Sequence, residues 1–151
     1  MSYIDFKKAI ELIDKNKAKL AYPPHAQNTE KIKLAEKKLN VKFPKSYREF
    51  LKKYGSIGIG GIEIYGLWND VIIKDTLYER ESNEENTFPL HYIPIHALGN
   101  GELSCLDTSQ INKEEECPIM AWYFGSTEKL SEDFGEFLLD KIVSQLKYMS
   151  C

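Results

Sequence analysis

Residues 32–61 read IKLAEKKLNVKFPKSYREFLKKYGSIGIGG, and the pattern inside this stretch decides the fold. Pro44 near the start of an amphipathic segment and Gly55 just beyond its end form the expected asymmetry of helix termini. We therefore predict a helix over 44–54. Its buried face carries aromatic and aliphatic side chains at helical spacing, namely Tyr47, Phe50, Leu51 and Tyr54.

The residues that follow this helix change period. Three glycines lie between Ser56 and Ile62, and after them comes the alternating run Ile62-Glu63-Ile64-Tyr65. Alternation of apolar and polar residues indicates a half-buried strand, and glycines supply the backbone freedom of a tight turn. The sequence predicts a strand or a hairpin within 56–67.

Two more helices are predicted on the N-terminal side. One covers about 3–19 with Ser2 as its cap, and Pro23-Pro24 ends that region because proline removes a hydrogen-bond donor. The other covers about 30–39 and is capped by Asn28 or Thr29.

The C-terminal half predicts a helix, a run of strands and a closing helix. Asn69 or Asp70 can cap the first helix, and Gly99-Asn100-Gly101 favours an antiparallel hairpin. The apolar run Pro118–Phe124 is typical of a central strand buried on both faces. The elements span about 71–85, 92–98, 102–107, 118–124 and, after Ser131, 132–149.

Helices, then strands, then a helix is the element order of an α+β protein. At 151 residues the chain has the length of one ordinary domain, so we expect a single domain over 1–151. In that domain an antiparallel sheet is packed by the N-terminal helices and the C-terminal helix.

Charge is divided unevenly along the chain, although the net charge is only −3. Residues 1–60 hold 14 Lys and Arg against 6 Asp and Glu, whereas residues 61–151 hold 6 against 17. Such asymmetry concerns partners rather than the fold. The pI near 5.7, and lysines on helix faces opposite the apolar stripes, disfavour nucleic acid as the partner.

The sequence also bears on location. Charged residues interrupt the apolar residues of the N-terminal segment, which does not fit a signal peptide, and no segment has the apolar length of a membrane span. We expect a cytoplasmic protein without membrane contact. The three cysteines form no CxxC pair, and free thiols are expected in a reducing compartment.

No motif for catalysis, a cofactor or a metal stands out. The glycines at 58–61 lack the lysine and the following helix of a phosphate loop. His91 and His96 are five residues apart on an expected strand, so their side chains should point to opposite faces. We expect no enzyme, no cofactor and no metal. A small hydrolase with a histidine beside Ser104 or Cys105 stays open as an alternative.

Two acidic clusters remain for interpretation. They are Glu79, Glu81, Glu84 and Glu85 near the end of the helix over 71–85, and Glu114, Glu115 and Glu116 in the loop before Pro118. They are either solvated charges or a negative face that docks a basic protein and speeds its capture.

Several stretches resemble the SUKH superfamily, which includes the fungal Smi/Knr-type cell-wall regulators. Residues 32–61 carry its N-terminal signature in Glu36, Phe43, Pro44, Tyr47, Phe50, Leu51, Gly55, Gly60 and Gly61. Ile64–Trp68, Tyr92–Ser109, Cys117–Phe124 and Phe134-x-x-Phe137-Leu138 follow in the order usual for the family. Tyr54 departs from the pattern, since the family often has asparagine there.

The resemblance implies a SUKH-like fold and the role of a bacterial immunity protein. Such proteins typically bind and neutralise a cognate polymorphic toxin in the cytoplasm, often a nuclease. The expected partner is therefore a toxin protein, most readily a basic nuclease. We add Trp68 and Asp70, which neighbour the first acidic cluster, to the hypothetical docking face. A regulatory adaptor of the fungal type, binding an endogenous partner, is the alternative.

Overall fold

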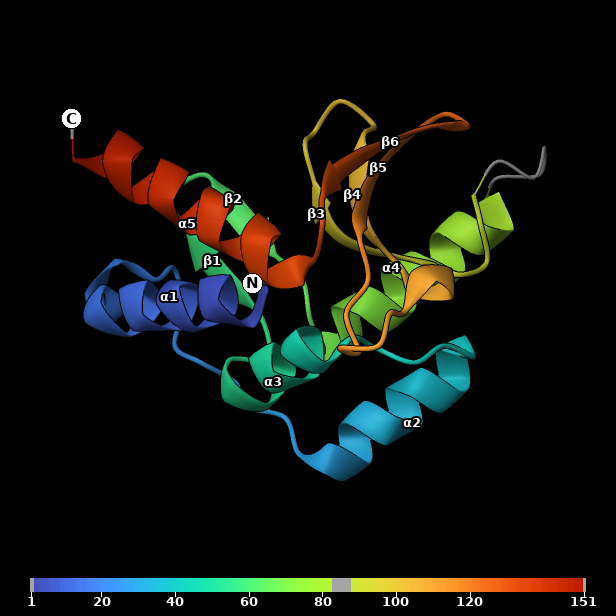
Figure 1. The fold of residues 1–151 in the computed structure, drawn as a ribbon, viewed down its shortest axis with the longest axis horizontal. Coiled ribbons are helices and arrows are strands. Elements are labelled where there is room, and N and C mark those ends of the chain that lie inside the picture. The colour runs from blue at the N-terminus through green and yellow to red at the C-terminus, as the bar shows by residue number, and fades with distance from the viewer. Residues whose placement is uncertain (1, 83–87, 151) are drawn as a thin grey trace.

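The structure, a computed structural model, describes residues 2–82 and 88–150. Within these ranges it contains five α-helices and two antiparallel sheets, so the predicted α+β class is confirmed (Figure 1). The helices are α1 Ser2–Lys15, α2 Thr29–Leu39, α3 Lys45–Lys53, α4 Val71–Ser82 and α5 Phe134–Met149. The strands are β1 Ile57–Ile59, β2 Ile62–Ile64, β3 Tyr92–Ala97, β4 Leu103–Asp107, β5 Ile119–Tyr123 and β6 Ser126–Ser131. Three short 3₁₀ turns are η1 Lys17–Lys19, η2 Trp68–Asp70 and η3 Thr108–Gln110.

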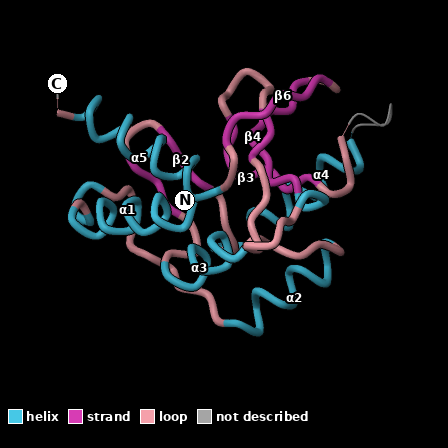
Figure 2. Tube along the Cα trace, in the orientation of Figure 1, coloured by secondary structure: helices cyan, strands magenta, loops and turns pink. Residues whose placement is uncertain are grey.

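The larger sheet has the strand order β3-β4-β5-β6, with every neighbouring pair antiparallel. The smaller sheet is the β1–β2 hairpin, predicted from the alternating run, and the two sheets are separate ribbons in Figure 2. A hydrogen bond from the backbone amide of Tyr65 to the carbonyl of Ile95, 2.7 Å long, links the segment after β2 to β3. The hairpin is thereby fixed beside the larger sheet.

The core forms where α3 meets α1, α5 and the hairpin. Tyr47 and Phe50 of α3 both pack edge-on against Phe134, the first residue of α5, with ring centroids 5.0 and 5.3 Å away. All four side chains predicted for the buried face of α3 are at most 1% exposed. Packing of that amphipathic face, rather than intrinsic propensity, is the main source of stability for so short a helix.

Two glycines turn the chain after α3. Gly55 has φ +76°, the left-handed conformation that commonly ends a helix, and its carbonyl accepts a hydrogen bond from the amide of Leu67 at 2.9 Å. A Cβ atom on Gly66 would lie 1.7 Å from the Gly55 carbonyl oxygen. The two segments approach so closely that only glycine fits, and this contact brings η2 against the end of α3.

The observed elements differ from the expected ones in two places. α1 ends at Lys15 and is followed by η1, whereas α4 agrees with its predicted range as far as Ser82 and residues 83–85 of that range lie outside the described residues. Strand β6 was missed because its residues are polar and almost all exposed, so it carries no apolar alternation. A tight turn forms it, with positive φ at Phe124 (46°) and Gly125 (91°), as type I′ hairpin turns require.

The run Pro118–Phe124 contributes an inner strand, as expected, but it is not buried throughout. Tyr123 is 44% exposed and Phe124 is 69% exposed because they reach the hairpin tip, where the sheet is no longer covered. Trp122, in contrast, is 3% exposed and meets Phe88 edge-on with centroids 5.2 Å apart.

This difference gives a stability prediction. Trp122→Ala should lower the free energy of unfolding by about 3–5 kcal/mol, because it removes a large buried ring and leaves a cavity. Tyr123→Ala, the matched change at the exposed neighbour, should cost less than about 1 kcal/mol. Urea unfolding of both variants measures the two values. Equal losses would contradict the assignment of the buried face of β5.

Candidate protein-docking surface

Trp68 lies at the centre of a small aromatic cluster on the surface. Its ring stacks on His25, with centroids 4.1 Å apart and planes 4° apart, and it also contacts Tyr22 at 4.5 Å. The cluster joins the loop after α1 to η2. Trp68 remains partly exposed, and the two residues after it, Asn69 and Asp70, both have left-handed φ, 58° and 56°. Asparagine and aspartate tolerate this conformation better than other L-residues.

Carboxylates adjoin the aromatic cluster through Tyr22. The Tyr22 hydroxyl donates to Oε2 of Glu63 at 3.0 Å, and Glu63 points outward from β2. Burial, followed by the neighbouring Glu79 and Glu63, raises the pKa of Asp75 on α4. Since both neighbours act in the same direction, the negative charges at this place reinforce one another.

Tyr65 is close enough to Glu63 of β2 and Asp75 of α4 for both carboxylates to affect its hydroxyl. Burial, then Glu63 and Asp75, raises the pKa of its hydroxyl. We call the whole set the acidic–aromatic surface. Its members are Tyr22, His25, Glu63, Tyr65, Trp68, Asp75 and Glu79.

Sequence reasoning selected two members of this surface, Trp68 and Glu79. Glu63 was detectable as the outward residue of the alternating run, but nothing local marks Tyr22 as its partner 41 residues away. The loop of Tyr22 is held by backbone hydrogen bonds to β1 and to the end of α3. Ala21 donates to the carbonyl of Gly58 at 2.8 Å, and His25 donates to that of Tyr54 at 2.7 Å.

The other members of the first predicted cluster have different positions. Glu81 is exposed on α4, and Asp70 is exposed and lines a hollow of about 130 Å³ that also includes Lys31 and Lys38 of α2. Glu84 and Glu85 lie outside the described residues.

The second predicted cluster belongs to a loop that is bound to α3. The sequence suggested that Glu116 is either a solvated charge or part of a docking face. Both interpretations need an exposed side chain, and Glu116 fits neither because it is only 3% exposed. Its two carboxylate oxygens accept hydrogen bonds from Ser46, one from the backbone amide at 3.0 Å and one from the hydroxyl at 2.6 Å. The carboxylate thus takes the place of an N-cap side chain at the first turn of α3, where negative charge is favoured.

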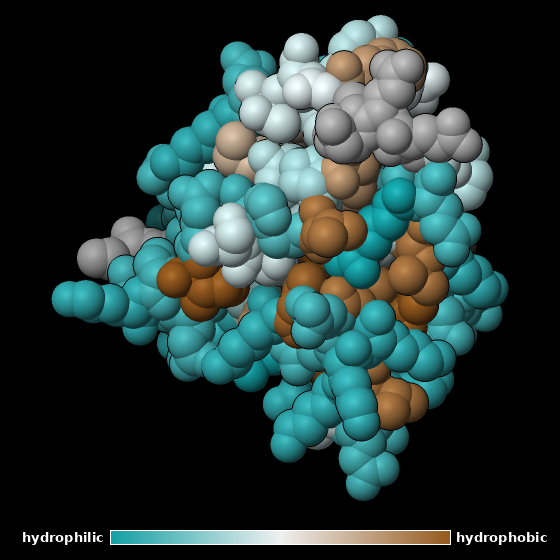
Figure 3. Space-filling view, turned by 90° about the vertical axis from the view of Figure 1, so that its right-hand side faces the viewer, coloured by the Kyte–Doolittle hydropathy of each residue, from teal (hydrophilic) through white to brown (hydrophobic). Residues whose placement is uncertain are grey.

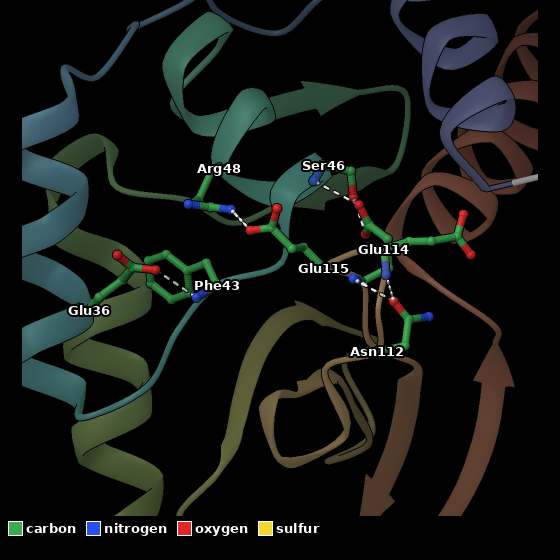
Figure 4. Close-up of polar contacts among 8 residues, drawn as sticks. Glu36, Phe43, Ser46, Arg48, Asn112, Glu114 and Glu115 are labelled. Carbon is green, nitrogen blue, oxygen red and sulfur yellow. Dashed lines mark hydrogen bonds and ion pairs between the residues drawn. The ribbon is translucent and has the colours of Figure 1, made fainter.

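Neighbouring contacts hold the same loop, as Figure 4 shows. Arg48 and Glu115 form an ion pair with Nη2 and Oε1 2.8 Å apart, and the Glu115 carbonyl accepts from the amide of Lys45 at 2.8 Å. The Asn112 side chain accepts from the amides of Glu114 and Glu116. The side chain of Glu115 is therefore already paired with Arg48. Glu114 is the residue of the triplet whose side chain points outward (Figure 4).

A second backbone donor near α3 is satisfied in a similar way. Oε2 of Glu36 on α2 accepts from the amide of Phe43 at 2.7 Å, which fixes the connection between α2 and α3. Glu36, Phe43, Pro44 and Gly55 all belong to the motif over 32–61, and each has a structural task. A family model described as SMI1-KNR4 cell-wall, of the SUKH group, matches residues 6–143.

The chain belongs to the SUKH superfamily. Most of the SUKH motif positions in this chain support the scaffold. Gly60 makes the turn of the β1–β2 hairpin with φ +58°, and the amide of Gly61 donates to the Gln145 side chain of α5 at 2.9 Å. Tyr65 and Trp68, from the motif stretch Ile64–Trp68, extend into the acidic–aromatic surface.

The groups considered for catalysis in this SUKH chain are mostly internal. Cys105 and Cys117 are free and buried, and burial raises the pKa of both thiols, which disfavours the nucleophilic thiolate. His96 lies opposite Ser104 in the β3–β4 register, and burial lowers the pKa of its imidazole. Its Nδ1 contacts the carbonyl of Glu63 at 3.0 Å, and the buried Ser104 hydroxyl has no hydrogen-bond partner within 2–82 and 88–150.

Two kinds of feature are absent from residues 2–82 and 88–150. No helix in these ranges has the length and apolar character needed to cross a membrane. Likewise, no group of three or more His, Cys, Asp or Glu side chains is placed there to hold a metal ion.

The Glu116 contact gives a prediction for stability and its dependence on pH. Glu116→Ala should lower the free energy of unfolding by about 2–4 kcal/mol, because it leaves the amide and hydroxyl of Ser46 buried without an acceptor. Glu116→Gln keeps one acceptor and should cost less. Chemical unfolding curves at several pH values measure both effects.

The pH dependence has a definite sign. Burial raises the pKa of Glu116, although the Ser46 hydrogen bonds act in the opposite direction. The folded state then holds this proton more tightly than the unfolded state, so the Glu116 contribution falls as the pH rises from the ordinary glutamate pKa to the raised one. Glu116→Gln should remove that slope, whereas Glu114→Gln in the same loop should leave it unchanged. An identical slope in wild type and Glu116→Gln would refute the assignment.

Proposed function

We propose that this SUKH protein is an immunity protein that neutralises a cognate toxin, a basic nuclease, by direct binding in the cytoplasm. The acidic–aromatic surface is the observation that carries the proposal. It joins a partly exposed Trp68, stacked on His25 and in tilted contact with Tyr22, to the carboxylates of Glu63, Asp75 and Glu79. Membership of the SUKH superfamily agrees with a binding role.

The chemistry of this surface suits a basic protein partner. A nuclease presents a positive groove to its substrate, and an acidic surface can occupy that groove and speed the encounter. Tryptophan and tyrosine are the side chains that most often dominate the binding energy of an interface. Because Trp68 is already stacked on His25, it loses little conformational freedom when a partner binds.

Neutralisation by binding needs no chemistry, and we propose no enzymatic activity and no cofactor for this chain. The thiols of Cys105 and Cys117 are buried, with their pKa raised. A nucleophile and its base need a hydrogen bond between them, and the hydroxyl of Ser104 makes none to His96 among the described residues. These groups are more easily explained as members of the core.

The alternative is an adaptor that binds an endogenous partner. The matching family model is described by its connection with the cell wall, which favours this role. The same surface would serve it. A toxin gene adjoining the gene for this chain supports immunity, whereas an endogenous partner recovered in its absence supports the adaptor.

Binding kinetics test the surface directly. We expect the triple variant Glu63→Gln, Asp75→Asn, Glu79→Gln to associate with the toxin encoded next to it about tenfold more slowly at low salt, because exposed charges steer encounter. Its rate should also depend less on salt. Trp68→Ala should instead raise the dissociation rate, by about 30-fold for a loss near 2 kcal/mol. Surface plasmon resonance separates the two rates.

A matched triple variant serves as the control. Glu11→Gln, Glu30→Gln and Glu128→Gln neutralise three exposed carboxylates on α1, α2 and β6 and remove the same total charge. The association rate of this control should stay near that of wild type. Equal slowing of both triple variants would mean that net charge alone steers the partner. A wild-type rate for the Glu63, Asp75 and Glu79 variant in low salt would place the interface elsewhere.

A further inference from the structure

An open cavity of about 690 Å³ lies on a different side of α4 from the carboxylates described above. The end of α2, the connection to α3, Arg80 of α4 and the segments around His91 and Thr108 line it. Figure 3 views the side of the molecule on which α2 and α4 end, and shows apolar side chains exposed among hydrophilic ones. A volume of this size is within the range of small-molecule sites.

Cationic side chains outnumber carboxylates in the lining. Lys37, Lys42 and Arg80 carry positive charge, whereas His91 has its Nε2 3.5 Å from the carboxylate of Asp107. We call Lys37, Lys42 and Arg80 the cationic pocket. Glu36 is the carboxylate in the lining, and one of its oxygens already accepts from the amide of Phe43 at 2.7 Å. A positive cavity stands out in a chain whose net charge is −3.

Arg80 is held rigidly in this wall. Its Nη2 donates to two backbone carbonyls, those of Leu39 at the end of α2 and Leu90 before β3, at 2.9 and 2.5 Å. Its Nε is buried and has no hydrogen-bond partner among the described residues. Burial lowers the pKa of the guanidinium. Carbonyl acceptors satisfy hydrogen bonds without supplying a negative charge, so an anion in the cavity would be a counter-ion for Arg80.

Apolar side chains line another part of the same cavity. Val41, in the connection after α2, is partly exposed, and Leu90 is 71% exposed. A bare anion would use the charged groups alone, whereas a molecule with a ring or an apolar part would also cover these side chains.

We propose that the cationic pocket binds a small phosphate-bearing molecule of nucleotide size. Arginine and lysine are the residues that bind phosphate groups, arginine through its planar fork and lysine as a point charge. The phosphate contacts Lys37, Lys42 and Arg80, and the rest of the molecule lies on Val41 and Leu90. This site is distinct from the acidic–aromatic surface and does not depend on the proposed immunity function.

Calorimetric titration of the purified full chain tests the site with four probes, which are magnesium-free ATP, AMP, inorganic phosphate and adenosine. ATP and AMP should bind, ATP more tightly because it carries more negative charge, while phosphate should bind more weakly and adenosine least. In ¹H–¹⁵N spectra, AMP should shift the amide signals of Asn40, Val41 and Thr108, which lie in the lining.

Charge reversal identifies the residues. The double variant Lys37→Glu, Lys42→Glu should weaken ATP binding by at least about tenfold, because two attractive charges become repulsive. Lys33→Glu with Lys52→Glu changes the net charge equally at exposed lysines of α2 and α3 outside the lining, and should keep the wild-type affinity within about threefold. Arg80 is left in place because it joins two backbone segments. Circular dichroism checks that both double variants are folded.

Several results would overturn the proposal. They are absence of ATP and AMP binding at millimolar concentration, equal weakening by the two double variants, and adenosine binding as tightly as AMP. Phosphate binding as tightly as AMP would refute the part of the proposal that concerns the size of the ligand. None of these outcomes affects the toxin-binding test, whose variants lie on the other surface.

Discussion

Helix α3 begins after a proline, so its first turn has no capping side chain of its own for the free backbone amides. Glu116, 70 residues later in the chain, supplies the acceptor and is buried in doing so. A buried carboxylate is tolerated only with hydrogen-bond partners, and Ser46 provides two. The contact therefore fixes the loop before β5 and the start of α3 at the same time.

The position of α3 determines much of the remaining arrangement. Its inner face packs Tyr47 and Phe50 against the start of α5, and its end at Gly55 meets the backbone at Gly66. Two SUKH motif residues near α3 show why the motif supports the scaffold: a Cβ atom on Gly55 would lie 2.0 Å from the His25 carbonyl oxygen, and loss of Glu36 would remove the acceptor of the Phe43 amide. A motif of this kind describes the scaffold and leaves the choice of partner to the surface.

Helix α4 places side chains of opposite charge in two different environments. Asp75 and Glu79 belong to the acidic–aromatic surface, whereas Arg80 lines the cationic pocket and bonds to the ends of other segments. Successive residues on a helix point about 100° apart, so Glu79 and Arg80 can face different sides although they are neighbours in the sequence. Acidic and basic groups of one helix thus belong to two separate surfaces in the folded protein.

The sequence by itself determined the α+β class, the helices around the motif over 32–61 and the two hairpins that glycine turns mark, because these depend on local periodicity and helix termini. It also selected Trp68 and Glu79. Only the tertiary structure decided that Glu116 is an internal cap and that Tyr22 joins Trp68 to Glu63, since both contacts connect residues far apart in the chain. Strand β6 needed the structure too, because backbone pairing with β5 forms it while its polar side chains give no signal. Which side chains are buried, which strands pair and which charges lie together all depend on the segments that meet in the fold. The local periodicity of the sequence does not contain that information.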